Sequence, residues 1–139
     1  MKYLLDTNVC IRYLNGSSEN VRKNMVLKKP QDIFLCSVVK AELFYGSMKS
    51  RFPEKNLAQQ KNFVDRFISL PFDDKAAEVY GRIRAQLEKA GTPIGPNDLL
   101  IAAIALSGEL TLVTGNTREF SRIERLSCED WEFVVPPAA

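Results

Sequence analysis

The chain has 139 residues, of which 45% are hydrophobic and 26% charged, and its formal net charge is +2 at pH 7. This length and composition are typical of one globular domain over residues 1–139, and the small net charge permits an anionic partner without requiring one. Because the sequence contains no histidine, it excludes Ser-His-Asp and Cys-His catalysis and zinc sites that need imidazole.

The first third of the chain predicts two short strands, each followed by a helix. Residues 3–5 form an apolar run typical of a buried strand, and the polar residues from Asp6 onward favour the start of a helix. A helix over residues 19–28, a strand over 33–36 and a helix over 38–48 are expected next. The N-terminus lacks the apolar core of a signal peptide, no stretch approaches a membrane span, and the scattered cysteines form no CxxC pair. We therefore expect a protein of the reducing cytoplasm with no membrane contact.

The remaining residues predict four helices and three short extended segments. The helices are expected over residues 57–68, 74–90, 97–107 and 117–121, and the extended segments over 70–72, 110–114 and 131–135. Short apolar strands that alternate with helices indicate an α/β sandwich with a mainly parallel sheet. Because such sheets bind ligands at the carboxyl ends of their strands, a functional site is expected there.

Four polar residues lie near those strand ends or in apolar helices. Asp6 follows the first strand and Asn116 follows the strand over residues 110–114, so both are expected at the carboxyl edge of the sheet. Asp98 opens the helix over residues 97–107, and Glu42 lies inside the helix that follows the second strand. Taken singly, Asp6 and Asp98 also suit a helix N-terminus and Asn116 a turn.

Glu42 is harder to explain as a surface residue. Val38 and Tyr45 share its face of the helix, and a carboxylate in apolar surroundings is costly unless a cation or hydrogen bonds compensate. Carboxylates that converge repel one another, and the sequence offers no histidine or obvious arginine partner for them. Ligation by oxygen alone suits Mg²⁺ or Mn²⁺, so the residues predict an acidic metal site that activates water for attack on a phosphate.

Four segments of the chain, in order, carry a resemblance to a known family. They are MKYLLDTNVCI at the start, SVVKAELFYG in the first third, GTPIGPNDLLIAAIA, and TLVTGNTREF after it. Together they extend through nearly the whole chain and resemble the PIN-domain toxins of the VapC group. The resemblance implies a PIN-like three-layer α/β/α sandwich and a ribonuclease that is the toxin of a type II toxin–antitoxin pair.

The resemblance also implies roles for individual residues. Asp6, Glu42 and Asp98 match the first three acidic residues of the family's site, with Asp6 and Asp98 as the main metal ligands. Asn116 stands where the family often has Asp, so the fourth catalytic position carries an amide oxygen without charge. One firmly bound Mg²⁺ is therefore expected, with Glu42, Asn116 and the nearby Glu119 as direct or water-mediated ligands.

Polar neighbours of these residues complete the expected site. Thr7 and Asn8 match a polar turn beside the first ligand, and Thr114 matches a polar residue that lines the site. Arg12, Lys40, Arg118 and Arg122 flank the site motifs and are candidates for RNA phosphate contact, although each is equally compatible with a solvated surface charge.

The expected reaction is attack of metal-activated water on an RNA phosphodiester, which leaves a 5′-phosphate and a 3′-hydroxyl. The resemblance implies structured RNA as substrate, with tRNA and the anticodon stem-loop of initiator tRNA foremost. It also implies a VapB-type antitoxin, a homodimer and a higher toxin–antitoxin assembly. Apolar residues of the early helices are compatible with a partner groove or with a simple core; they are Ile11, Tyr13, Leu14, Leu43, Phe44 and Tyr45. Two alternatives stay open: a PIN-like nuclease of RNA processing or DNA repair, and a catalytically silent PIN module that only binds a partner protein.

Overall fold

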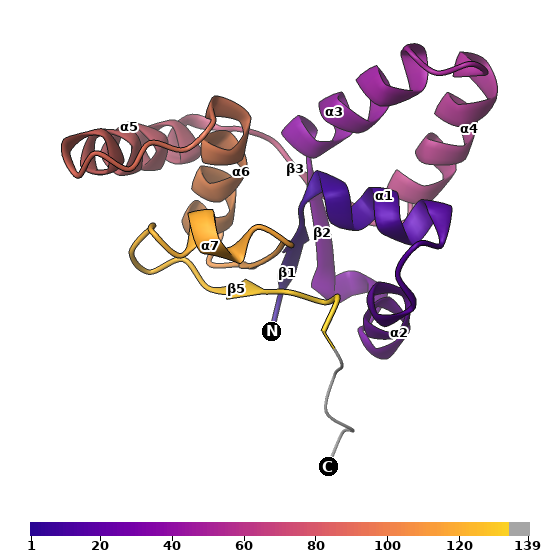
Figure 1. Cartoon of the computed structure of the whole chain (residues 1–139), viewed down its shortest axis with the longest axis horizontal. Helices are drawn as coiled ribbons and strands as arrows, with labels where there is room; N and C mark the ends of the chain where they lie inside the picture. Colours follow the sequence, from indigo (N-terminus) through magenta and orange to yellow (C-terminus); the bar gives the residue numbers. More distant parts are fainter. Residues whose placement is uncertain (134–139) are drawn as a thin grey trace.

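A computed structural model describes residues 1–133, in which five parallel strands form one sheet. The strands are β1 (Tyr3–Leu5), β2 (Ile33–Cys36), β3 (Ile68–Leu70), β4 (Thr111–Val113) and β5 (Cys128–Glu129). The helices of these residues are α1 (Thr7–Asn15), α2 (Glu19–Leu27), α3 (Ser37–Met48), α4 (Pro53–Val64), α5 (Asp74–Lys89), α6 (Pro96–Ser107) and α7 (Thr117–Phe120). They flank the sheet (Figure 1), which confirms the predicted PIN-like α/β/α sandwich.

The strand order β3-β2-β1-β4-β5 places β1 at the centre of the sheet. From β1 the chain runs outward through β2 to β3, and it then returns to the other side of β1 to form β4 and β5. The order therefore reverses beside β1, and this reversal is the point at which open α/β sheets bind ligands. Leu5 pairs with Val113, so the residues that follow them, Asp6 and Thr114, leave the sheet next to each other.

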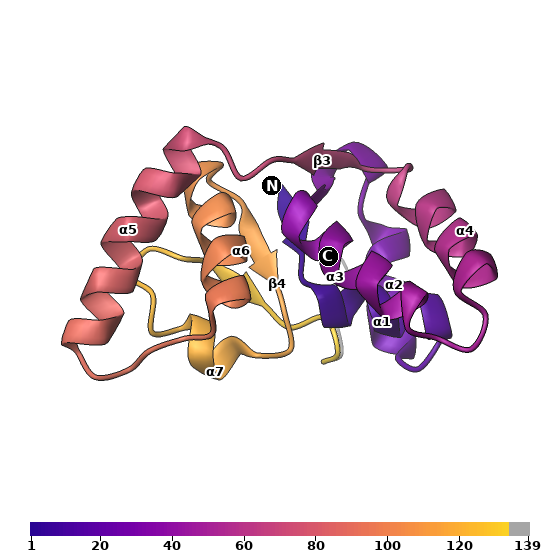
Figure 2. The ribbon, with the colours of Figure 1, turned by 90° about the horizontal axis from the view of Figure 1, so that it is seen from above.

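Apolar side chains on both faces explain how such short strands are held. Leu4, Leu35 and Leu112 have no exposed surface, as expected for parallel strands covered by helices on both sides. α6 packs against both α5 and α3, and its residues Ile101 and Ala102 are fully buried, which confirms the prediction of a central helix. Figure 2 shows α5 outside α6 at one end of the molecule and α4 at the other.

The expected final strand over residues 131–135 is wrong in its position. β5 lies earlier, where Cys128 and Glu129 pair with β4, and residues 134 and 135 lie outside the described part of the chain. Trp131 is buried because its ring packs edge-on against Tyr3, with 5.2 Å between ring centroids, rather than because it pairs with a strand. The apolar side chain of Trp131 therefore indicates packing at the edge of the core and not a strand.

The chain between the second and third strands also differs from expectation. The helix expected over residues 57–68 begins earlier, at Pro53, because proline suits the first turn of a helix, and it ends at Val64. Residues 68–70 form β3 instead, and Ile68 pairs with Phe34 of β2. In residues 1–133 no helix has both the length and the apolar content that crossing a membrane requires.

Candidate active site

Asp6 lies at the carboxyl end of β1 and caps α1. Its Oδ1 accepts a hydrogen bond from the Thr7 backbone N–H at 2.7 Å, and its Oδ2 accepts one from the Thr114 hydroxyl at 2.8 Å. The side chain is only 7% exposed. Burial raises the pKa of Asp6, and the hydrogen bonds from Thr114 and Thr7 offset part of that rise. Asp6 therefore caps α1, as one of the two interpretations predicts, and its buried carboxylate lies at the carboxyl end of β1, where the site is expected.

Glu42 is joined to this strand end through Thr7. The Thr7 hydroxyl donates a hydrogen bond to Glu42 Oε1 at 2.9 Å, which links the start of α1 to the middle of α3. Val39 and Leu43 on the same helix are buried in the core, whereas Glu42 is half-buried at its border. The position of Glu42 is thus fixed by one face of α3 and by a polar contact at the edge of the sheet.

The pKa of Asp98 is raised by burial and also by three other carboxylates. It lies in the first turn of α6 and is half-buried. Burial, followed by the negative charges of Asp6, Glu42 and Glu119, raises the pKa of Asp98 to about 6. Neither ion pair found within residues 1–133 involves any of these four carboxylates. Asp98 therefore lies close enough to Asp6, Glu42 and Glu119 to be affected by their negative charges, and no basic side chain within residues 1–133 forms an ion pair with any of the four.

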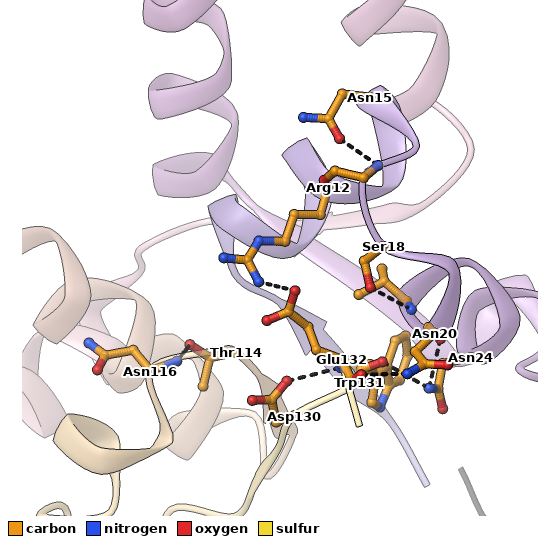
Figure 3. A network of polar contacts seen from close by, with 12 residues as sticks. Arg12, Asn15, Ser18, Asn20, Asn24, Thr114, Asn116, Asp130, Trp131 and Glu132 are labelled. Atoms are coloured by element: carbon orange, nitrogen blue, oxygen red, sulfur yellow. Dashed lines mark hydrogen bonds and ion pairs between the residues drawn. The ribbon is translucent and has the colours of Figure 1, made fainter. Parts of the chain in front are cut away.

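Asn116 completes the site through Thr114. The Asn116 backbone N–H donates to the Thr114 hydroxyl oxygen at 3.0 Å, and its Nδ2 donates to Glu119 Oε2 at 2.5 Å. Thr114 has no exposed surface, so one buried hydroxyl joins Asp6 to the turn that carries Asn116. Figure 3 shows Thr114 and Asn116 side by side in this turn.

Within residues 1–133, the side chains of the other predicted site residues make no hydrogen bond to the acidic residues described above. Asn8 is exposed in the first turn of α1. Arg12 forms an ion pair with Glu132, Lys40 is half-buried on α3, and Arg118 is exposed on α7. Cys36, which ends β2 at the same edge of the sheet, is not among the residues that the sequence predicts for the site. Burial raises the pKa of the Cys36 thiol to about 11, and Asp6 and Glu42 add to that rise.

Three of the four carboxylates of the site accept a hydrogen bond. Asp6 faces Thr7 and Thr114, Glu42 faces Thr7, and Glu119 faces Asn116. Accordingly, within residues 1–133 no three acidic, cysteine or histidine side chains are already arranged to hold a metal ion. The candidate metal-ligating atoms are nevertheless all oxygens, and the carboxylates form no ion pair with a basic side chain within residues 1–133. Oxygen ligands that carry negative charge are what a hard divalent cation requires.

Sequence comparison identifies the family of this site. The sequence model of the PIN domain matches residues 3–126, which include every member of the acidic cluster. The chain belongs to the PIN-domain family. It is 44% identical over 131 residues to the tRNA(fMet)-specific endonuclease VapC of Shigella flexneri, covering 94% of this chain and 98% of that one. It is 41% identical over 133 residues to ribonuclease VapC2 of Rickettsia felis, covering 95% and 99%.

Solved structures of the family have the same fold. The crystal structure of DNA-bound VapBC from Salmonella typhimurium is similar with a TM-score of 0.88 and 42% identity, covering 94% of this chain and 98% of that one. VapBC2 from Rickettsia felis, bound to a DNA fragment from its promoter, is similar with a TM-score of 0.87 and 40% identity, covering 94% and 99%. The resemblance drawn from four segments of the sequence is thereby confirmed.

Proposed function

We propose that the protein is a metal-dependent endoribonuclease and the toxin of a type II toxin–antitoxin pair. The observation that carries the proposal is the gathering of Asp98 with three other carboxylates, unpaired with any cation, at the switch point of the sheet. Relatives named ribonuclease VapC2 and tRNA(fMet)-specific endonuclease VapC, at 41% and 44% identity, support the same activity. The proposal treats residues 1–139 as one PIN domain.

The donor set favours Mg²⁺, with Mn²⁺ as a substitute. Burial and, after it, repulsion by the neighbouring carboxylates raise the pKa of Asp98, and a bound cation would offset the cost of the charged form. Asp6 and Asp98 would hold the ion, and Glu42, Asn116 and Glu119 would bind it directly or through water. Because the Asn116 amide carries no charge, we propose one firmly bound ion in the absence of RNA.

The proposed reaction is hydrolysis of an RNA phosphodiester by water, which leaves a 5′-phosphate and a 3′-hydroxyl. The cation, when bound, supplies charge neutralisation at the phosphate and lowers the pKa of water. Two hydrogen bonds hold the Asp6 carboxylate in place at the end of β1, beside the proposed cation site. Thr7 holds Glu42 beside it, where Glu42 accepts the proton of the attacking water.

The proposed partner is a VapB-type antitoxin that covers a groove between α1, α3 and α4. The groove has a volume of about 540 Å³, and Ile11 and Leu14 line it together with polar residues of α3 and α4. Ile11 and Leu14 are about two-fifths exposed, and Tyr45, which precedes the lining residue Gly46 on α3, is 66% exposed. Of the predicted partner-groove residues, Leu43 is instead buried in the core. The VapBC structures from Salmonella typhimurium and Rickettsia felis support such a pair, and a homodimer within a larger assembly is part of the proposal.

The proposed substrate is tRNA, with initiator tRNA cut in its anticodon stem-loop. The Shigella flexneri relative, which bears tRNA(fMet) in its name, is the support for this choice. A cytoplasmic location is proposed with it, because that is where this RNA is found.

The test is to map the ends of initiator tRNA after incubation with the purified chain and Mg²⁺. We expect a single cut in the anticodon stem-loop with a 5′-phosphate downstream and a 3′-hydroxyl upstream. Asp98→Asn should lower the rate about a hundredfold or more, whereas Asp65→Asn, an exposed control at the C-terminal cap of α4, should leave it unchanged. A 2′,3′-cyclic phosphate would exclude attack by water.

The same experiment separates the two alternatives. A silent PIN module would bind the antitoxin but cleave no RNA at any metal concentration. A nuclease of RNA processing would cut precursor RNAs in preference to mature tRNA.

A further inference from the structure

Arg12 and Glu132 form an ion pair at the rim of the candidate site. They are 120 residues apart in the chain, and Figure 3 shows the Arg12 guanidinium reaching from α1 toward the Glu132 carboxylate. Of the basic residues considered for phosphate contact, Arg12 alone has an acidic partner within residues 1–133. Lys40 and Arg118 have none there.

The pair lies directly against the turn that carries the site residues. A methyl group on Gly115 would stand 3.7 Å from Glu132 Oε2 and 4.0 Å from Arg12 Nη1. Gly115 sits between Thr114, whose hydroxyl donates to Asp6, and Asn116. The Arg12 guanidinium therefore lies at the edge of the acidic site, against the turn that carries Asn116.

The backbone of Glu132 is held by contacts that do not involve its carboxylate. Asn20 Nδ2 donates to the Glu132 carbonyl at 2.6 Å, and the Glu132 N–H donates to Asp130 Oδ1 at 2.9 Å. Asn24 Nδ2 donates to the carbonyl of the neighbouring Trp131 at 3.2 Å, and the Trp131 side chain is buried. Removing the Glu132 carboxylate should therefore leave this segment in place, so its role is not simply to anchor the chain.

A carboxylate and a phosphate offer arginine the same geometry of oxygen acceptors. The Arg12 and Glu132 side chains are 41% and 35% exposed, so water screens their pair and exchanging one acceptor for another costs little. RNA, by contrast, brings negative charge to a site that already repels it, and it needs a cation there.

We propose that Arg12 binds a phosphate of the RNA substrate at the rim of the site, and that Glu132 occupies Arg12 in the free protein and gives way to that phosphate. This inference rests on the proposed ribonuclease function. Glu132 is then a positioning residue, which keeps the guanidinium extended over Gly115, and it is also a competitor that weakens RNA binding. Arg12 is a substrate-binding residue.

The experiment measures the binding of a fluorescently labelled anticodon stem-loop of initiator tRNA in EDTA, with RNA integrity checked on gels. Glu132→Gln should lower the Kd about two- to fivefold, the range for losing an exposed competing ion pair. The matched control is Glu88→Gln, which breaks the exposed Arg84–Glu88 pair of α5 and should leave the Kd unchanged. Arg12→Gln should raise the Kd about tenfold and lower the slope of log Kd against log salt by about 0.7 to 0.9.

The double variant gives the decisive result. With Arg12→Gln already present, adding Glu132→Gln should change the Kd no further, because the competitor has lost its target. A Glu132→Gln variant that binds RNA no better than the unchanged protein, or that binds better whether or not Arg12 is present, overturns the inference. The inference also fails if Glu132→Gln binds the antitoxin more tightly but not RNA, because Arg12 would then contact the protein partner.

Cleavage of the same RNA with Mg²⁺ separates failure of this inference from failure of the proposed function. If the unchanged chain cuts RNA but the Arg12 and Glu132 variants bind it equally, only the exchange is wrong. If the unchanged chain neither binds nor cuts RNA, the ribonuclease function itself fails. Should Arg12→Gln not fold, as judged by circular dichroism, Arg12→Lys replaces it and should raise the Kd by losing the two-pronged contact.

Discussion

The hydroxyl of Thr114 donates a hydrogen bond to the Asp6 carboxylate at 2.8 Å, across the gap between the ends of β4 and β1. The same oxygen accepts the backbone N–H of Asn116 at 3.0 Å. One buried side chain thus orients a candidate metal ligand and also fixes the turn that carries the next polar residue of the site. The parallel pairing of Leu5 with Val113 is what places these two side chains together.

Thr114→Val should destabilise the protein by about 1–3 kcal/mol, because the Asn116 N–H and one oxygen of Asp6 lose their partner in a buried place. Urea denaturation measures this change. Thr111→Val is the matched control, since Thr111 is buried in β4, the strand that Thr114 follows, and makes no side-chain hydrogen bond within the described residues. RNA cleavage should fall as well, and equal loss of stability in both variants would argue against a special role for the Thr114 hydroxyl.

The contact between Thr7 and Glu42 should couple α1 to α3 in catalysis. Thr7→Val removes the donor to Glu42 Oε1, and we expect the cleavage rate to fall about tenfold because Glu42 loses its orientation. Thr7→Ser keeps the hydroxyl and should retain most of the activity. In a Glu42→Gln background, Thr7→Val should cost much less than it does alone, and additive effects of the two changes would show that the residues act independently.

Much of this arrangement could be predicted because it follows from short-range patterns. Asp6 directly follows a buried strand, and Glu42 is a carboxylate within an apolar helix. Both features indicate a site at the carboxyl edge of the sheet without knowledge of the fold. The pair of Arg12 and Glu132 could not be predicted, since it depends on how β5 returns beside β4 and where the chain then turns. Burial of Trp131 against Tyr3 and strand pairing leave the same apolar signal in the sequence, so the sequence predicts a strand there that residues 131–133 do not form.

The stability of the metal-free protein should fall as the pH rises from about 4 through 6. The pKa of Asp98 is about 6 in the folded protein against an ordinary value of 3.8, with burial as the main cause and the neighbouring carboxylates next. A raised folded-state pKa means that the folded state holds its proton more tightly. The resulting stability is fully present below 3.8 and is lost as the pH passes through 6.

Thermal unfolding in EDTA between pH 4 and pH 8 tests this dependence. Asp98→Asn should reduce the fall and should raise the Tm of the metal-free protein at pH 7.5, while Asp65→Asn should behave as the unchanged protein does. Added Mg²⁺ should raise the Tm more at pH 7.5 than at pH 5, because protons compete with the cation for the same oxygens. A Tm that is independent of pH over this range in EDTA would contradict the electrostatic account of the site.

Asn116→Asp should lower the stability of the metal-free protein and raise its affinity for metal ions. The Asn116 amide donates to Glu119, and a carboxylate in its place would instead repel Glu119 and add a fifth negative charge to the neighbourhood of Asp98. We therefore expect a lower Tm in EDTA and a larger rise in Tm with Mn²⁺ than in the unchanged protein. Asn62→Asp, on the exposed face of α4, adds the same charge away from the site and should alter neither quantity. Calorimetric titration with Mn²⁺ should show a second bound ion in Asn116→Asp alone, because the new carboxylate adds the negative charge that the Asn116 amide lacks. Two ions bound to the unchanged chain would contradict the proposed single firmly bound ion.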